Sequence, residues 1–154
     1  MVMPPFHKIL VAVDFSGFAA EAVRVAAGLS KLCDAPLTLV HVYQLPIYPL
    51  PPEGMIFPPP EVLAEQQAGI DRELARAAAE ATAAGAVAVT TTVRQGPPAE
   101  EIVELARADG YDLICMGTHG RTGIKHILLG SVAEQVVRRA PCAVLTIRPS
   151  ASGG

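Results

Sequence analysis

Glycine and hydroxyl residues concentrate in one stretch of the chain, where their spacing suits the binding of an anion. Three glycines fall within Gly117–Gly123, and Gly130-Ser131 follows seven residues later. Glycine permits positive φ and lets backbone N–H groups approach a ligand closely. A helix that begins at Ser131 would add free N–H groups and a positive dipole end. We therefore expect the loop and the helix start to hold one polyphosphate from two sides.

Neighbouring side chains add polar groups to this stretch. Ser131, with Glu134 three residues on, forms a capping-box pattern that predicts the helix cap at Ser131. Its hydroxyl can cap the helix and also contact phosphate, because it donates one hydrogen bond and accepts others. Arg121 offers a charge for a phosphate. His119 is either a phosphate contact or a solvated loop histidine. Because glycine loops are weak motifs, a merely structural connection stays open on these residues alone.

Strand-like and helix-like segments alternate along the chain. Apolar and β-branched runs predict strands at Lys8–Asp14, Pro36–Val42, Ala86–Val93, Tyr111–Met116 and Cys142–Ile147. Helical spacing, caps and proline positions predict helices over 17–33, 61–84, 98–110 and 131–140. Five strands alternating with helices imply a doubly wound parallel sheet with right-handed crossovers. We expect a single domain over 1–149 and a disordered tail at 150–154.

Gln44–Pro60 interrupts this alternation. The segment holds seven of the chain's 14 prolines, and proline lacks the N–H that helices and sheets need. We expect an extended loop, and loops of this length in compact domains are usually lids or mobile segments. A proline-rich ligand for a protein partner is the alternative.

The ends of three predicted strands direct attention to one edge of the sheet. Ligands of doubly wound sheets bind outside the carboxyl ends of the strands, where the strand order reverses. Asp14, Val42 and Gly117 come at or directly after such ends. The Asp14 carboxylate can accept hydrogen bonds from a sugar hydroxyl, or it can stabilise the dipole of the helix that follows.

The composition excludes several classes of protein. Hydrophobic residues make up 51% and charged residues 18% of the chain, which suits one packed core and excludes disordered and collagen-like proteins. The net charge of −3 argues against a nucleic-acid partner. Cys33, Cys115 and Cys142 form no C-x-x-C pair, and the last two lie in apolar runs, which indicates buried thiols in a reducing compartment. Without a signal-peptide pattern or an apolar run long enough to span a bilayer, we expect a cytoplasmic protein with no membrane partner.

Motifs of other nucleotide enzymes are absent from the sequence. It has no Walker P-loop, no G-x-G-x-x-G, no nucleophile elbow and no metal-binding histidine spacing. Hydrolysis needs a positioned base and usually a metal held by protein carboxylates, and Asp14 is the only acid clearly at a strand end. We expect any Mg²⁺ to be held mainly by phosphates and water, so binding with little or no turnover is predicted.

Five segments in order resemble the universal stress protein family, in its nucleotide-binding form. They are VAVDFS at 11–16, HVY at 41–43, GPPAEEIVELA at 96–106, DLICMGTHGRTG at 112–123 and GSVAEQVVRRAPCAVLTIR at 130–148. The family's ATP-associated pattern is glycine, two residues, glycine, nine residues, then Gly-Ser or Gly-Thr. Here it falls on Gly117, Gly120, Gly130 and Ser131 with unbroken spacing. The resemblance implies a flavodoxin-like strand order of 3-2-1-4-5 with helices on both faces, and an ATP-type ligand.

The resemblance also implies roles for individual residues. It puts Asp14 near the ribose or adenine, the Val42 backbone on the adenine edge, and Met116 with the glycine loop around the phosphates and ribose. The full set of candidate nucleotide-binding residues is Ala12, Val13, Asp14, Val42, Met116, Gly117, Thr118, His119, Gly120, Arg121, Thr122, Gly130, Ser131 and Val132. His41 is interpreted as a strand residue and nothing more.

The last predicted strand carries an expectation about assembly. Residues 142–147 should form an apolar sheet edge that pairs across a two-fold axis into a homodimer, as the resemblance also implies.

The leading functional hypothesis is an ATP-binding stress sensor or regulator with an unknown protein partner. A slow ATPase or phosphotransferase and a ligand-free interaction module are the alternatives.

Overall fold

A computed structural model describes residues 3–45, 48–49, 54–120 and 129–149. The five strands of the main sheet are β1 (Ile9–Ala12), β2 (Pro36–Tyr43), β5 (Val87–Gln95), β6 (Leu113–Gly117) and β7 (Ala143–Ile147). The helices are α1 (Gly17–Cys33), α2 (Pro60–Ala83), α3 (Pro98–Asp109) and α4 (Ser131–Arg139). Two further short strands are β3 (Tyr48–Pro49) and β4 (Met55–Ile56).

The main sheet is parallel throughout and runs in the order β5-β2-β1-β6-β7, which confirms the predicted order. Its central strands are buried on both faces, as a continuous apolar run predicts. Side chains alternate between two cores because successive residues of a strand point to opposite faces. Ile9 and Val11 pack in one core, and Leu10 packs in the other.

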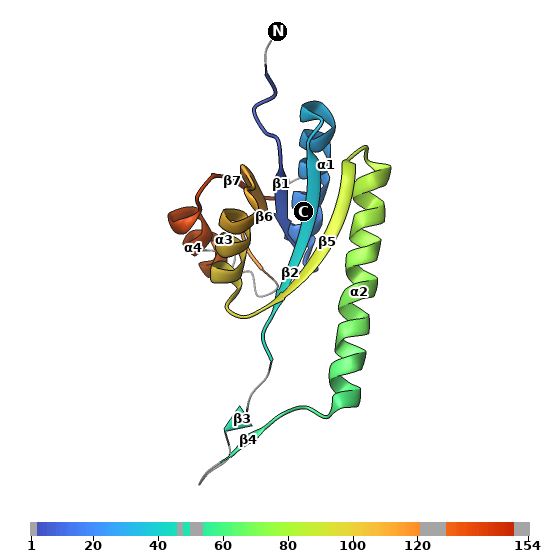
Figure 1. The fold of residues 1–154 in the computed structure, drawn as a ribbon, viewed down its shortest axis with the longest axis vertical. Coiled ribbons are helices and arrows are strands. Elements are labelled where there is room, and N and C mark those ends of the chain that lie inside the picture. The colour runs from blue at the N-terminus through green and yellow to red at the C-terminus, as the bar shows by residue number, and fades with distance from the viewer. Residues whose placement is uncertain (1–2, 46–47, 50–53, 121–128, 150–154) are drawn as a thin grey trace.

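The helices form a layer on each face of the sheet (Figure 1). Helices α1 and α2 cover the face that Ile9 and Val11 point to, and they contribute Ala22, Ala26 and Leu74 to that core. Helices α3 and α4 cover the opposite face with Ile102, Val136 and their neighbours. The carboxyl ends of the strands and the starts of the helices therefore meet at one edge of the sheet.

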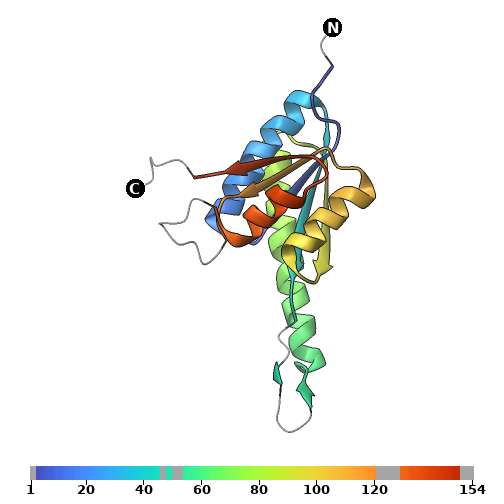
Figure 2. The ribbon, with the colours of Figure 1, turned by 90° about the vertical axis from the view of Figure 1, so that its left-hand side faces the viewer.

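The proline-rich segment differs from the extended loop that its composition predicts. Strands β3 and β4 pair antiparallel within it, with Tyr48 opposite Ile56 and Pro49 opposite Met55. Proline tolerates such short edge pairing because an edge strand leaves half of its N–H groups without a strand partner. The pair projects away from the sheet, beyond the start of α2 (Figures 1 and 2). It does not fold over the sheet edge as a lid.

Several boundaries and burials also differ from the sequence predictions. Strand β1 ends at Ala12 rather than Asp14, because the chain turns at Phe15, whose φ is 63°. Cys33 and Cys115 are buried as expected of apolar thiols, but Cys142 is only half-buried, since it precedes an edge strand. No helix in the described part of the chain combines the length and apolarity needed to cross a bilayer.

Candidate functional site

One pocket of about 340 Å³ opens at the carboxyl ends of the central strands. All the predicted site residues that the structure describes line it, namely Ala12, Val13, Asp14, Val42, Met116, Gly117, Thr118, His119, Gly120, Gly130, Ser131 and Val132. Arg121 and Thr122 lie outside the described residues. A volume in this range suits a small ligand or cofactor.

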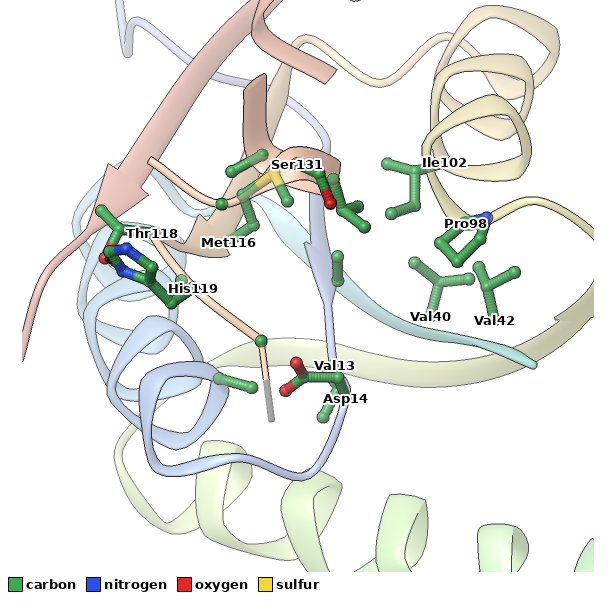
Figure 3. A pocket seen from close by; sticks show the side chains of 17 residues that line it. Val13, Asp14, Val40, Val42, Pro98, Ile102, Met116, Thr118, His119 and Ser131 are labelled. Atoms are coloured by element: carbon green, nitrogen blue, oxygen red, sulfur yellow. Dashed lines mark hydrogen bonds between the residues drawn. The ribbon is translucent and has the colours of Figure 1, made fainter. Parts of the chain in front are cut away.

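The pocket has an apolar side and a polar side (Figure 3). Val40 and Val42 of β2 face Pro98 and Ile102 of α3 across the apolar side. Asp14, Thr118, His119 and Ser131 lie around the rest of the pocket. Such a division suits a ligand with a flat apolar part and a charged or hydroxylated part.

The start of α4 forms one wall of the pocket. The N-cap is Gly130, with no side-chain hydrogen bond, and the first helical hydrogen bond runs from the Glu134 N–H to the Gly130 carbonyl. The capping box predicted at Ser131 is therefore wrong, and Ser131 is the first residue of the helix. Because Gly130 holds the cap position, the Ser131 hydroxyl makes no capping bond. The N–H groups of Ser131, Val132 and Ala133 have no helical partner, and these residues line the pocket.

The glycine loop is held directly against this helix start. The Gly130 N–H donates to the Thr118 carbonyl at 2.6 Å, and the Thr118 N–H donates to the Ile147 carbonyl at 3.0 Å. A Cβ at Gly130 would lie 3.1 Å from the Thr118 carbonyl oxygen. Glycine thus allows a close approach of two backbone segments here, which places the loop and the α4 start side by side.

The other two glycines of the pattern also serve close packing rather than positive φ. Among the described glycines, positive φ occurs at Gly85, Gly96 and Gly110, and not within the pocket. A Cβ at Gly117 would lie 2.6 Å from the Phe18 Cβ, so this glycine lets β6 meet α1. A Cβ at Gly120 would lie 2.9 Å from Asp14 Oδ2. Gly117, Gly120 and Gly130 therefore do not use the positive φ that glycine permits.

Asp14 has one carboxylate oxygen committed to the protein. Its Oδ1 accepts from the Ser16 N–H at 3.0 Å and from the Ser16 hydroxyl at 2.5 Å. Its Oδ2 faces Gly120 across the pocket edge. Asp14 therefore both supports the start of α1 and presents an acceptor to the pocket, so the two readings of this residue are compatible.

His119 is packed rather than simply solvated. Its Nδ1 lies 3.0 Å from the Thr118 hydroxyl, and its ring lies 5.4 Å from the Phe18 ring at a tilt of 51°. The contact with Phe18 places the ring against α1. The role of His119 toward a phosphate stays a prediction.

Metal-binding and nucleophilic groups are scarce in this region. Within the described residues, no group of three or more histidine, cysteine or acidic side chains is arranged to hold a metal ion. Cys115 lies on β6 one residue before Met116, and burial raises the pKa of its thiol to about 12. That thiol stays protonated at neutral pH, so it is not a nucleophile for the pocket.

Sequence reasoning missed part of the pocket lining. On the apolar side it missed Val40, Pro98 and Ile102, and it also missed Ala19 and Ala133 among the lining residues. Val40 could have been found, because it lies two residues before Val42 and therefore on the same face of β2. Pro98 and Ile102 reach the pocket through the packing of α3 on that face, which carries no local signal.

Comparisons with known proteins match the whole domain. Residues 5–148 match the universal stress protein family. Universal stress protein MJ0531 of Methanocaldococcus jannaschii is 37% identical over 144 residues, covering 93% of this chain and 82% of that protein. A universal stress protein solved in complex with cAMP has a TM-score of 0.71 and 28% identity, covering 94% of this chain and 98% of the other. The universal stress protein of Archaeoglobus fulgidus in complex with dAMP has a TM-score of 0.64 and 26% identity, covering 92% and 98%.

Proposed function

The chain belongs to the universal stress protein family, and we propose that it binds an adenine nucleotide, ATP in particular, in the pocket at the carboxyl edge of the sheet. The observation that carries the proposal is the start of α4. Its uncapped first turn lies in the pocket wall, next to a glycine loop that is hydrogen-bonded to it. Free N–H groups and the helix dipole favour a phosphate at that position.

The phosphates would lie between the glycine loop and the start of α4. The N–H groups of Ser131 and Val132 point out of the first turn, and the Ser131 hydroxyl is exposed and makes no hydrogen bond to another described residue. It can therefore donate to a phosphate oxygen. Gly120 is exposed and lacks a side chain that would block the approach. His119 and Arg121 are proposed as further phosphate contacts.

The base would occupy the apolar side of the pocket. Val40, Val42, Pro98 and Ile102 offer aliphatic surface to both faces of a planar ring. The Val42 backbone offers an N–H and a carbonyl to the ring edge, which matches the acceptor N1 and the donor N6 amino group of adenine. Asp14 Oδ2, between the two ends of the pocket, would accept from a ribose hydroxyl.

The nucleotide complexes of the relatives support an adenine ligand. The two solved relatives hold cAMP and dAMP, which share the adenine base and differ in their sugar and phosphate parts. The preference for ATP rests on the glycine pattern of Gly117, Gly120, Gly130 and Ser131, which the family resemblance associates with ATP. Asp14 is the acidic residue among the pocket-lining residues, so we propose that any Mg²⁺ is held mainly by phosphates and water.

We propose that the protein holds ATP with little or no turnover, as a cytoplasmic stress sensor or regulator read by a protein partner. Hydrolysis would need a base positioned for the attacking water. Asp14 Oδ1 already accepts two hydrogen bonds from Ser16, so this oxygen is held within the protein rather than directed at a water molecule.

A homodimer through β7 is proposed for the assembly. Strand β7 pairs with β6 on one side, and Leu145 on it is 36% exposed. The other side of β7 is a sheet edge, and antiparallel pairing with a second copy would satisfy its N–H and carbonyl groups. Light scattering at micromolar concentration should show a dimer, and Leu145→Lys should shift it toward monomer. A monomeric parent protein would refute this assembly.

The ligand is tested by releasing whatever the purified protein carries. Denaturation followed by chromatography should yield adenine nucleotide, and calorimetry of the emptied protein should show tighter binding of ATP than of GTP. No released nucleotide together with no ATP binding would refute the proposal. Single-turnover assays with Mg²⁺ test the enzymatic alternative, since hydrolysis above background that is lost in Asp14→Asn would establish an ATPase.

A further inference from the structure

The His41 side chain makes a hydrogen bond where the pairing of β1 and β2 stops. Its Nδ1 lies 2.7 Å from the carbonyl oxygen of Val13. A carbonyl only accepts, so the proton of this bond is on Nδ1. The His41 ring also stacks on Phe15, with centroids 4.4 Å apart and ring planes 24° apart. His41 therefore contacts the turn that carries Asp14.

This bond occupies the place of the next rung in the parallel ladder. The Val13 N–H donates to the Val40 carbonyl at 2.8 Å. In a regular parallel ladder the Val13 carbonyl would then accept from the Val42 N–H. Instead, β1–β2 pairing ends at Ala12 opposite Val40, and the Val13 carbonyl accepts from His41. The imidazole thus substitutes for the backbone donor of Val42.

The Val42 N–H is consequently available to the pocket. The Val40 carbonyl points toward β1, since it accepts from Val13, and the Tyr43 carbonyl points toward β5, since it accepts from Gly96. Polar groups of successive strand residues point to opposite sides, so those of Val42 point to the β1 side, beyond the end of β1. Val42 lines the pocket at its apolar side.

We propose that His41 is a positioning residue for base recognition, which takes the Val13 carbonyl so that the Val42 N–H stays free to bind the ligand's base. This inference rests on the proposed adenine-nucleotide function. His41 acts through the backbone, because it lies on the opposite face of β2 from Val40 and Val42, stacked on Phe15. The stack also holds Phe15 at its positive φ of 63°, a conformation that costs energy for a side chain of this size.

Substitutions of His41 that remove its Nδ1 donor, with or without keeping an aromatic ring, test the proposal. His41→Phe keeps a ring against Phe15 and removes the donor. His41→Leu removes the donor without an aromatic ring, and it serves if the Phe variant does not fold. His41→Asn is the matched control, since its amide nitrogen occupies the place of Nδ1 and can donate to Val13. Each variant is compared with the parent protein, and thermal unfolding checks that each is folded.

The first readout is amide hydrogen exchange of Val42 in the nucleotide-free protein. In His41→Phe or His41→Leu the Val42 N–H should bond the Val13 carbonyl and exchange about tenfold more slowly, as expected when a backbone bond forms. In His41→Asn exchange should match the parent. Unchanged Val42 exchange in both donor-less variants would overturn the proposal, whether or not the protein binds nucleotide.

The second readout is calorimetry with ATP and with 1-deaza-ATP, which lacks the N1 acceptor. The parent and His41→Asn should bind ATP about tenfold more tightly than the analogue, the value of one hydrogen bond. The donor-less variants should bind both nucleotides equally. If they still discriminate as the parent does, or if His41→Asn loses as much affinity as they do, His41 has only a packing role. A parent protein that binds no adenine nucleotide refutes the proposed function instead, and the exchange readout then still decides the role of His41.

Discussion

The helices α1 and α4 both begin at the pocket edge of the sheet, but they start in different ways. Each N-cap residue has an extended backbone, with φ and ψ of −82° and 166° at Ser16 and −68° and 163° at Gly130. The Ser16 hydroxyl oxygen accepts from the Ala19 N–H at 3.2 Å, and the hydroxyl donates to Asp14. Gly130 offers no side chain, so the first turn of α4 keeps its donors for another partner.

This difference indicates that the polar groups at the start of α1 are satisfied within the protein, whereas those at the start of α4 are available to a ligand. At α1 the donor of Ala19 and the acceptor Oδ1 of Asp14 bond within the protein. At α4 the same kind of donors line the pocket without a side-chain partner. Because unsatisfied N–H groups at a helix start attract anions, the phosphates are expected at α4.

Helix α3 also borders the pocket without a side-chain cap, yet it suits an anion less well. Its first residue is Pro98, which has no N–H, and Glu100 and Glu101 lie in its first turn. The first turn of α4 carries a single acid, Glu134, which pairs with Arg138 at 3.0 Å. The α4 end of the pocket therefore differs from the α3 end in its free N–H donors and in having fewer acidic side chains in the first helical turn. The apolar side chains lie at the α3 end.

The difference between the two helix starts is tested most strongly by removing one N–H group from each. Ser131→Pro removes the first N–H and the hydroxyl of α4, and we expect ATP affinity to fall about a hundredfold, as for the loss of two hydrogen bonds to a charged group. Proline is tolerated at the first helical position, so stability should change little. Calorimetry and thermal unfolding measure the two effects.

Gly17→Pro is the matched control at the first position of α1. The Gly17 position has space for a side chain, with no other atom within 4 Å of its Cβ. This variant should bind ATP as the parent does. Equal losses of affinity in Gly17→Pro and Ser131→Pro would show that the two helix starts do not differ toward the ligand.

The contact between Asp14, which precedes α1, and Gly120 of the glycine loop gives the second prediction. Gly120→Ala would place a Cβ 2.9 Å from Asp14 Oδ2, so the carboxylate must move out of its place beside the loop. We expect about tenfold weaker ATP binding, because one ribose hydrogen bond is lost. Gly28→Ala is the control, since its position within α1 is open. It should raise stability by about 0.5–1 kcal/mol and leave the ATP affinity unchanged, and a loss of affinity there would point to a global effect of substituting glycine.

The sequence predicted the sheet well because the pattern and the topology rules agree. Continuous apolar runs such as Ile9–Ala12 are typical of parallel strands, and right-handed crossovers leave few arrangements of five of them. Gly117, Gly120 and Gly130, which the glycine spacing singles out, all line one pocket. The packing contact that each glycine allows was harder to predict. Phe18 of α1, about a hundred residues earlier, decides that Gly117 must lack a side chain.

Two other local features could not be predicted for the same physical reason. The Ser131–Glu134 pattern fits a capping box, but the bond from Gly130 to the Thr118 carbonyl fixes Gly130 as the cap. His41 lies in β2, as predicted, but the pattern did not indicate its bond to Val13, 28 positions away in the chain. Contacts between distant segments decide both outcomes, and neither carries a pattern within a short window of sequence.

The smallest expected effects come from alanine at the two serines, and they separate the helix starts most directly. Ser16→Ala removes the cap of α1 and should lower the free energy of unfolding by about 1 kcal/mol, or about 2–4 °C in Tm for a domain of this size. ATP affinity should stay close to that of the parent, because the Ser16 N–H still holds Asp14.

Ser131→Ala should give the opposite result. The Ser131 hydroxyl caps nothing, so the free energy of unfolding should be unchanged, while ATP affinity should fall about fivefold with the loss of one hydroxyl donor. Urea unfolding and calorimetry on both variants give four numbers, of which two should change and two should not. If Ser131→Ala destabilises the protein as much as Ser16→Ala does, the Ser131 hydroxyl is a cap in solution, and the two helix starts do not differ in side-chain capping.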